Sequence, residues 1–231
     1  MKTNIKLLFL IIAIFSLSSQ LYSQAFEKGN WNIDTDLGIG IYGTKSTTTT
    51  KIGPLTQSKS EVDGTASSVF RLGVEYGLTN RIGLGVKFGY NNYFIAEEDK
   101  DTLNSVKGVD FLINFNFHLL KANRNDLFIT LGLGVSNAKW EYNTLPGIFL
   151  SSASGKGSYF TFGITDRIFF SDNFGILFNL SYAGYKYDVT YELTEETKTA
   201  LSGFGLFGGY SIDSELILRG VYFGTGLAIK F

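Results

Sequence analysis

The stretch FRLGVEYGLTNRIGLGVKFGY, residues 70–90, decides the fold class. Large apolar side chains stand at alternate positions on both sides of a short turn at Thr79 and Asn80, with glycine or charged residues between them. A period of two places successive side chains on opposite faces of a β-strand. The stretch therefore predicts two antiparallel strands, each with one apolar face and one face of small and charged residues.

The same alternation recurs along the chain and predicts eight strands in all. They are centred on residues 29–43, 70–78, 82–90, 109–118, 127–136, 160–164, 174–182 and 220–231. The connections alternate between long and short, which in an up-and-down barrel puts all long loops at one end. We expect a long polar loop over about residues 44–66 and an elaborated last loop over residues 188–219. A further strand near residues 44–66 would raise the count to ten.

Glycine decides which solvent the apolar face meets. Within a strand it costs roughly 0.5 to 1 kcal/mol relative to alanine, yet the less apolar face carries it repeatedly, as at Gly83, Gly85 and Gly89. A face in water gains nothing from this, whereas the interior of an eight-stranded barrel is only just wide enough for side chains to fill. Lipid also requires every backbone group to be paired, as a closed barrel achieves. We expect an all-β, antiparallel up-and-down transmembrane β-barrel, with a soluble sandwich or lipocalin-like barrel as the alternative.

The small-residue face then lines the lumen, and its charges nearly balance. Four acids and three bases are expected there, namely Asp34, Asp36, Arg71, Glu75, Arg81, Lys87 and Asp110. Buried charges are tolerated only when they are paired and hydrogen-bonded. We therefore expect a structural charge network that plugs the lumen, with a narrow solute-conducting path as the alternative. The aromatic side chains expected to form girdles at the membrane surfaces are Trp31, Tyr90, Tyr93, Trp140, Tyr142 and Tyr182.

The N-terminus has the three parts of a secretory signal peptide: Lys2 and Lys6, an apolar run over residues 7–17, and a small-residue cleavage region. We expect residues 1–23 to be the signal peptide and residues 24–231 to be one barrel domain. Cleavage after Ala25 and an uncleaved membrane anchor are the alternatives. The absence of cysteine excludes a disulfide framework and a thiolate site. A formal net charge of −1 argues against nucleic acid as a partner.

Little in the sequence indicates a reaction site. The single histidine, His118, is expected on the lumen side as a hydrogen-bonded structural residue, since no Ser or Asp stands beside it in the sequence. The acidic run Glu97, Glu98, Asp99 and Asp101 is expected to be solvated rather than to hold a metal ion. No helix pattern follows the glycine-rich stretches, so they do not indicate a phosphate loop. We expect no enzyme activity, no cofactor and no metal site.

Several segments together carry a resemblance to a known family. They are the signal peptide, QAFEKGNW (residues 24–31), the hairpin of residues 70–90, FTFGITDRIFFSDNFGILFNLSY (residues 160–182), and the terminal Phe231. These resemble the small outer-membrane β-barrel proteins of Gram-negative bacteria, of the OmpA and OmpX kind. The resemblance implies a location in the cell outer membrane, with lipid around the barrel, and lends no catalytic residue.

The resemblance also implies a role for the end of the chain. A terminal aromatic with apolar residues at alternate positions before it serves as the signal read by the barrel-assembly machinery, and the matching positions are Phe223, Leu227, Ile229 and Phe231. The expected function is that of an integral barrel of structural or surface-interaction type, whose extracellular loops bind a partner that the sequence does not name. The alternatives are a narrow pore for small solutes and a lipid-active barrel enzyme.

Overall fold

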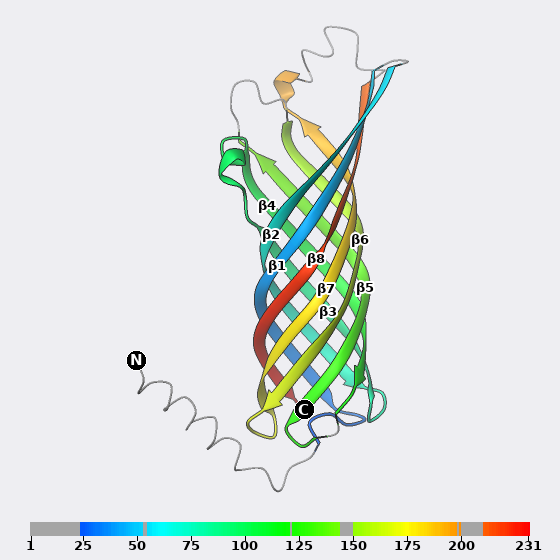
Figure 1. Cartoon of the computed structure of the whole chain (residues 1–231), viewed down its shortest axis with the longest axis vertical. Coiled ribbons are helices and arrows are strands. Elements are labelled where there is room, and N and C mark those ends of the chain that lie inside the picture. Colours follow the sequence, from blue (N-terminus) through cyan, green and yellow to red (C-terminus); the bar gives the residue numbers. More distant parts are fainter. Residues whose placement is uncertain (1–23, 53–54, 121, 144–149, 198, 200–209) are drawn as a thin grey trace, which may run out of the picture.

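The computed structural model describes residues 24–52, 55–120, 122–143, 150–197, 199 and 210–231. Eight antiparallel strands follow one another in chain order around a closed barrel (Figure 1). Their bounds are β1 Trp31–Ile52, β2 Leu55–Gly77, β3 Ile82–Tyr93, β4 Leu103–His118, β5 Asn125–Tyr142, β6 Leu150–Phe169, β7 Phe174–Leu193 and β8 Tyr210–Lys230. A short 3₁₀ helix, η1 Glu97–Asp99, lies in the connection between β3 and β4. The expected fold class is confirmed.

The barrel closes between its first and last strands. β1 pairs with β2 on one side and with β8 on the other, from Asn32 opposite Lys230 to Ile52 opposite Tyr210. The short turns and the C-terminus share one end of the barrel, and the long connections share the other (Figure 1). We call these the turn end and the loop end.

An apolar belt surrounds the outside of the barrel, as the alternation predicts. Its members include Leu37, Ile39 and Ile41 of β1, which are 64%, 53% and 60% exposed. Large apolar side chains facing outward on every strand suit a hydrocarbon environment and not water. Toward the loop end the outward side chains turn polar. There Lys139 bonds Glu141 over 3.0 Å and holds the pKa of that carboxyl below its usual range. Among the described residues, no helix is long and apolar enough to cross a membrane.

The strands have unequal lengths at the loop end. Residues 44–66, expected to form a loop, instead continue β1 and β2 as a hairpin that stays in register to Ile52 opposite Leu55. Serine, threonine and charged residues occupy most positions on both faces there, so the segment lacks the apolar contrast that marks a strand in the sequence. Figure 1 shows this hairpin and the start of β8 rising together above the rest of the barrel. The described residues form eight strands and not ten.

The elaborated last loop is shorter than expected. β7 continues to Leu193 and β8 begins at Tyr210, so residues 188–193 and 210–219 belong to strands. Of the remaining residues in that segment, 198 and 200–209 lie outside the described part of the chain. The predicted signal peptide, residues 1–23, lies outside it as well and stays a prediction.

Candidate functional site

The interior of the barrel near the turn end is filled by one arginine and three carboxylates. Arg167 of β6 is fully buried and donates to Asp34, Glu75 and Asp126, with nitrogen to oxygen distances of 2.6 to 2.9 Å. Asp126 is the cross-strand neighbour of Arg167, whereas Asp34 of β1 and Glu75 of β2 come from other parts of the wall. A guanidinium group offers five donors in a rigid fork and stays charged, so it can hold three carboxylates at once.

His118 completes this cluster, which we call the charged layer. Its Nδ1 atom lies 2.5 Å from Asp126 and its Nε2 atom 3.0 Å from Glu75. Asn116 also donates to Glu75, over 2.6 Å. Every carboxylate in the layer is therefore hydrogen-bonded, as buried charge requires. The expectation that His118 is a hydrogen-bonded residue on the lumen side agrees with this geometry.

The segment before β1 covers the charged layer at the turn end. The ring of Phe26 stacks on His118, with ring centroids 3.3 Å apart and planes 7° from parallel. Ala25 beside it is fully buried, and its amide donates to the carbonyl of Ala122. Lys230 holds the same segment by donating to the carbonyl of Gln24 over 3.0 Å. Residues 24–30 thus fold back under the barrel and close it from below.

Little free volume remains within the charged layer. A cavity of ≈ 10 Å³ lies between Asp34, Lys87, Asn114 and Phe128, large enough for about one water molecule. Gly83 shows why small residues are needed on this face, because a Cβ atom there would collide with the carboxylate of Glu75. The close packing at Gly83 agrees with the prediction that glycine makes room for larger side chains inside the barrel.

Above the charged layer, a second arginine lies among aromatic rings. The guanidinium carbon of Arg71 lies 3.6 Å from the ring centroid of Tyr222, and its Nη2 atom donates to the hydroxyl of Tyr159 over 3.0 Å. The Tyr222 hydroxyl in turn donates to Asp36. A cation over an aromatic face is stabilised by the ring quadrupole, so Arg71 is held without a direct carboxylate contact.

Asp110 marks the top of the polar part of the lumen. Its carboxylate accepts hydrogen bonds from Asn91 over 2.8 Å, Ser136 over 2.5 Å and Tyr185 over 3.1 Å. These donors come from β3, β5 and β7. Three neutral donors around one buried carboxylate satisfy it without a cation.

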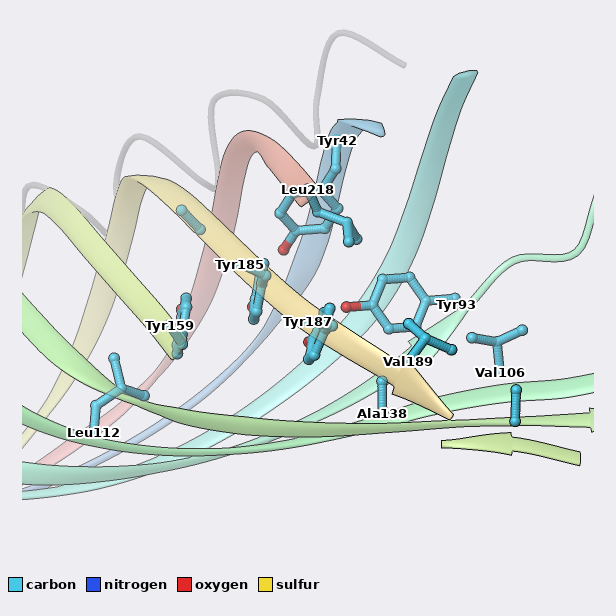
Figure 2. Close-up of a cluster of buried hydrophobic side chains, with 12 residues drawn as sticks. Tyr42, Tyr93, Val106, Leu112, Ala138, Tyr159, Tyr185, Tyr187, Val189 and Leu218 are labelled. Atoms are coloured by element: carbon cyan, nitrogen blue, oxygen red, sulfur yellow. The ribbon is translucent and has the colours of Figure 1, made fainter. Parts of the chain in front are cut away.

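From this level toward the loop end, the interior is aromatic. Tyr159 and Tyr185 stack with ring centroids 4.3 Å apart, and Tyr187 follows Tyr185 at 5.8 Å, with both pairs close to parallel. Figure 2 shows these three rings in a row, with the hydroxyl of Tyr93 directed toward Tyr187. What we call the tyrosine layer consists of Tyr42, Tyr93, Tyr159, Tyr185 and Tyr187. It packs against Val106, Leu112, Ala138, Val189 and Leu218.

A cavity of ≈ 210 Å³ opens above the tyrosine layer at the loop end. We call it the mouth cavity. Its inner wall includes the buried Tyr93, Val106, Ala138, Tyr187 and Leu218, and its outer wall includes the exposed Asp63, Gly64, Phe94, Ala96 and Asp99. Strand pairing between β2 and β3 ends at Ser67 opposite Tyr93, so β2 has no strand partner on this side beyond that point in the described chain. The cavity lies beside this gap.

Six of the seven residues expected in the lumen lie within the barrel. Asp34, Asp36, Arg71, Glu75 and Asp110 are buried, and Lys87 is half-buried. These six residues do not form one network. The hydrogen bonds of Arg71 and those of Asp110 do not connect either residue to the group around Arg167. Arg81 is the exception, because its expected position in the lumen is wrong. It lies in the turn before β3 and is exposed, since the strand begins one residue later at Ile82.

Three of the aromatics expected in the girdles also lie inside, one of them Tyr142, which is half-buried against the interior apolar cluster. Tyr93 is 7% exposed and belongs to the tyrosine layer. Trp140 is half-buried and packs edge-on against Tyr187, at 6.3 Å between ring centroids. Tyr90 and Val135 face outward. Tyr93 and Trp140 each lie an odd number of residues further along the same strands, so they face inward. Trp31, Tyr90 and Tyr182 do face outward.

The four positions of the proposed assembly signal lie on the last strand and just beyond it. Phe223, Leu227 and Phe231 are exposed on the outside of the barrel, and Ile229 is half-buried. Their recognition by an assembly machinery stays a prediction. In the described part of the chain, no group of three or more His, Cys, Asp or Glu side chains is arranged to hold a metal ion.

Sequence reasoning missed the residues at the centre of the charged layer. Arg167 and Asp126 stand near strand ends, just outside the predicted strand segments 160–164 and 127–136. The alternation nevertheless contains a signal for both. Phe162 and Ile164 face outward at even positions, so the odd positions of the same strand, including Arg167, face inward. Leu127 faces outward, so its neighbour Asp126 faces inward.

Comparison with known proteins supports the fold. The sequence matches no protein-family model and no curated protein. Among solved structures, the outer membrane protein OprG from Pseudomonas aeruginosa superposes with a TM-score of 0.54 at 13% identity, covering 89% of this chain and 97% of that one. AlkL, an outer membrane protein, has a TM-score of 0.48 at 12% identity, covering 92% and 94%. Ail of Yersinia pestis has a TM-score of 0.38 at 15% identity, covering 87% and 99%.

Proposed function

Since the chain has the fold of the small outer-membrane β-barrel proteins, we propose that it is an integral outer-membrane protein with a closed lumen, which binds a partner at its loop end. The apolar belt supports the membrane location, and the short turns support a periplasmic position for the turn end. The loop end then faces the outside of the cell.

The observation that carries the closed lumen is the charged layer with its cover. Arg167, His118 and three carboxylates fill the cross-section. Their hydrogen bonds connect five strands, namely β1, β2, β4, β5 and β6. Phe26 stacks directly beneath them. A solute or a hydrated ion would have to break several charge-assisted hydrogen bonds to pass, and each removal of one partner leaves a buried charge behind. This favours a structural filling over a pore.

Binding at the loop end is supported by the extension of β1, β2 and β8. About ten residues of β1 beyond the apolar belt correspond to roughly 30 Å of strand. On its second edge, β2 has no strand partner between residues 56 and 65 in the described chain. Such an edge is a ready site for pairing with another polypeptide. A barrel that only filled the membrane would not need this extension.

The closed lumen is tested by conductance in planar bilayers. The purified protein should give no steady single-channel steps, under conditions in which an open porin does. Removing the cover alone, with Phe26→Ala, should leave the protein silent because the Arg167 bonds remain. Steady steps from the unaltered protein that disappear in a variant of Glu75 or Lys87 would show a conducting path and overturn the proposal.

The orientation is tested by labelling, because the chain contains no cysteine. Ser58→Cys places a thiol in the exposed hairpin between β1 and β2, and Asp172→Cys places one in the exposed turn between β6 and β7. A membrane-impermeant maleimide should label the first variant on intact cells and the second only after lysis. The reverse pattern, or equal labelling of both, would contradict the orientation. Heat-modifiable migration of the outer-membrane fraction on a gel checks the location.

A further inference from the structure

We propose that the mouth cavity is a binding site for a small organic cation with an apolar body, such as an alkylated amine. This deepens the proposed function and rests on its loop-end binding. The cavity lies on the outer side of the tyrosine layer, so a ligand would enter from outside and stop there. Binding at this site therefore requires no passage through the barrel.

The chemistry of the walls selects the ligand class. Aromatic rings of Tyr93, Phe94, Trp140 and Tyr187 contribute to the lining, with aliphatic surface from Ile95, Leu103, Val106, Leu216 and Leu218. Aromatic faces attract cations whose charge is spread over alkyl groups, and rings in a partly desolvated site do so more strongly. A compact, strongly hydrated metal ion would lose its water shell against such walls without gaining enough ligands.

The charges at the cavity have one sign. Asp63 of β2 and Asp99 of η1 approach it from two different elements, and the described lining contains no Lys or Arg. Asp63 accepts one bond from the amide of Gly64, and neither carboxylate forms a described ion pair. The nearest basic side chain in the adjoining groove, Lys100, pairs with Glu97. Two free carboxylates beside apolar walls favour a positive ligand and disfavour an anion.

A polar atom at the inner wall adds to the fit. The hydroxyl of Tyr93 is buried and directed toward Tyr187 (Figure 2), but it forms no hydrogen bond of ordinary geometry with a described residue. Buried polar groups in folded proteins are nearly all bonded, so an unpaired one at a cavity indicates a place for a water or a ligand group.

The experiment uses choline as the probe and 3,3-dimethylbutan-1-ol as its uncharged carbon analogue. The chain has two tryptophans, Trp31 at the turn end and Trp140 at the cavity. The Trp31→Phe variant therefore reports on the cavity alone through the fluorescence of Trp140. The protein is studied in uncharged maltoside micelles, because phosphatidylcholine lipids would compete with the probe.

Choline should change the Trp140 emission saturably and bind about 10-fold more tightly than the carbon analogue, as one cation with aromatic and carboxylate partners implies. The double variant Asp63→Asn with Asp99→Asn, made in the same background, should lose this preference. Asp101→Asn, an exposed carboxylate near η1 that does not line the cavity, should keep it. Heat-modifiable migration confirms that each variant is folded.

Equal or tighter binding of the carbon analogue would overturn the cation assignment and show a neutral apolar site. Absence of a saturable response to either probe, in folded protein, would overturn the site itself. Both outcomes are distinct from failure of the closed barrel, which is read from conductance and labelling. A protein that is silent in bilayers and does not bind choline loses only this inference.

Discussion

The charged layer and the tyrosine layer fill the same cylinder with different chemistry. Around Arg167, charged groups are held by hydrogen bonds of fixed geometry, and the cavity between them has room for about one water. Around Tyr185, rings stack at 4.3 and 5.8 Å and leave a cavity of ≈ 210 Å³ at their outer side. Charges require partners at short distances, so they close a lumen. Rings pack over a wider range of distances, so they can border an open site.

The largest effect should follow from removing the cation of the charged layer. Arg167→Met keeps much of the volume but leaves three buried carboxylates without the guanidinium group that all three share. We expect a loss of about 3 to 5 kcal/mol in the free energy of unfolding, measured by urea titration in micelles. Lys186→Met is the control, since it breaks the exposed ion pair with Glu215 and should cost less than about 1 kcal/mol. Equal losses for the two variants would remove the distinction between the layers.

A smaller effect should follow from removing the cover. Phe26→Ala deletes the ring stacked on His118. Because residues 24–30 can detach without opening the strands, we expect about 1 to 2 kcal/mol, less than a phenylalanine in a closed core would cost. Faster amide exchange at Ala25 and Gly29 in NMR spectra would show that the segment detaches. Lys28→Ala, an exposed neighbour, should change neither quantity. A loss as large as that for Arg167→Met would mean that the segment is part of the barrel's core.

The tyrosine layer should tolerate the loss of a single hydroxyl. Tyr185→Phe removes one of three donors to Asp110 and keeps both ring stacks. We expect about 1 kcal/mol by urea titration, since Asn91 and Ser136 still satisfy the carboxylate. Tyr182→Phe on the outer face serves as the control and should change stability by less than about 0.5 kcal/mol. A loss above 3 kcal/mol would show that this layer is as tightly coupled as the charged one.

The smallest effect should come from the hairpin above both layers. Replacing residues 48–59 by Asn-Gly joins Thr47 to Ser60, which lie opposite each other, through a turn that favours antiparallel strands. The removed residues whose side chains the structure describes are polar, and most of them are exposed, so the free energy of unfolding should change by less than about 0.5 kcal/mol. The shortened protein should also keep its choline response, because Asp63 and Asp99 remain. Loss of the folded, heat-modifiable form would show that the extension holds the barrel together.

The parts of the fold that carry apolar contrast were predictable from the sequence. Alternation placed Leu37, Ile39 and Ile41 on the outside and Asp34 and Asp36 on the inside. It failed over residues 44–66, where serine and threonine on both faces remove the contrast although the strands continue. The apolar pattern marks the apolar belt, so it ends where the belt ends and not where the strand ends.

The candidate site was predictable only in part, and for a different reason. Alternation tells which wall position faces the lumen, and applied throughout it places Arg167, Asp126, Tyr93 and Trp140 inside. It does not tell which side chains meet across the lumen. Arg167 and Asp34 are 133 residues apart and join opposite parts of the wall. Such pairings depend on the barrel's size and tilt, which one strand's sequence does not contain.

The seam between β1 and β8 sets a condition on how the barrel can fold. The first strand finds its second partner only in the last strand, with Asn32 opposite Lys230. Until the final residues are in place, every intermediate has two open edges able to pair with another chain. Closing a loop of nearly two hundred residues also makes the last step slow, because these contacts are the most distant in the chain. A chain cut short at its C-terminus would keep its apolar belt and most of its interior, yet remain an open sheet.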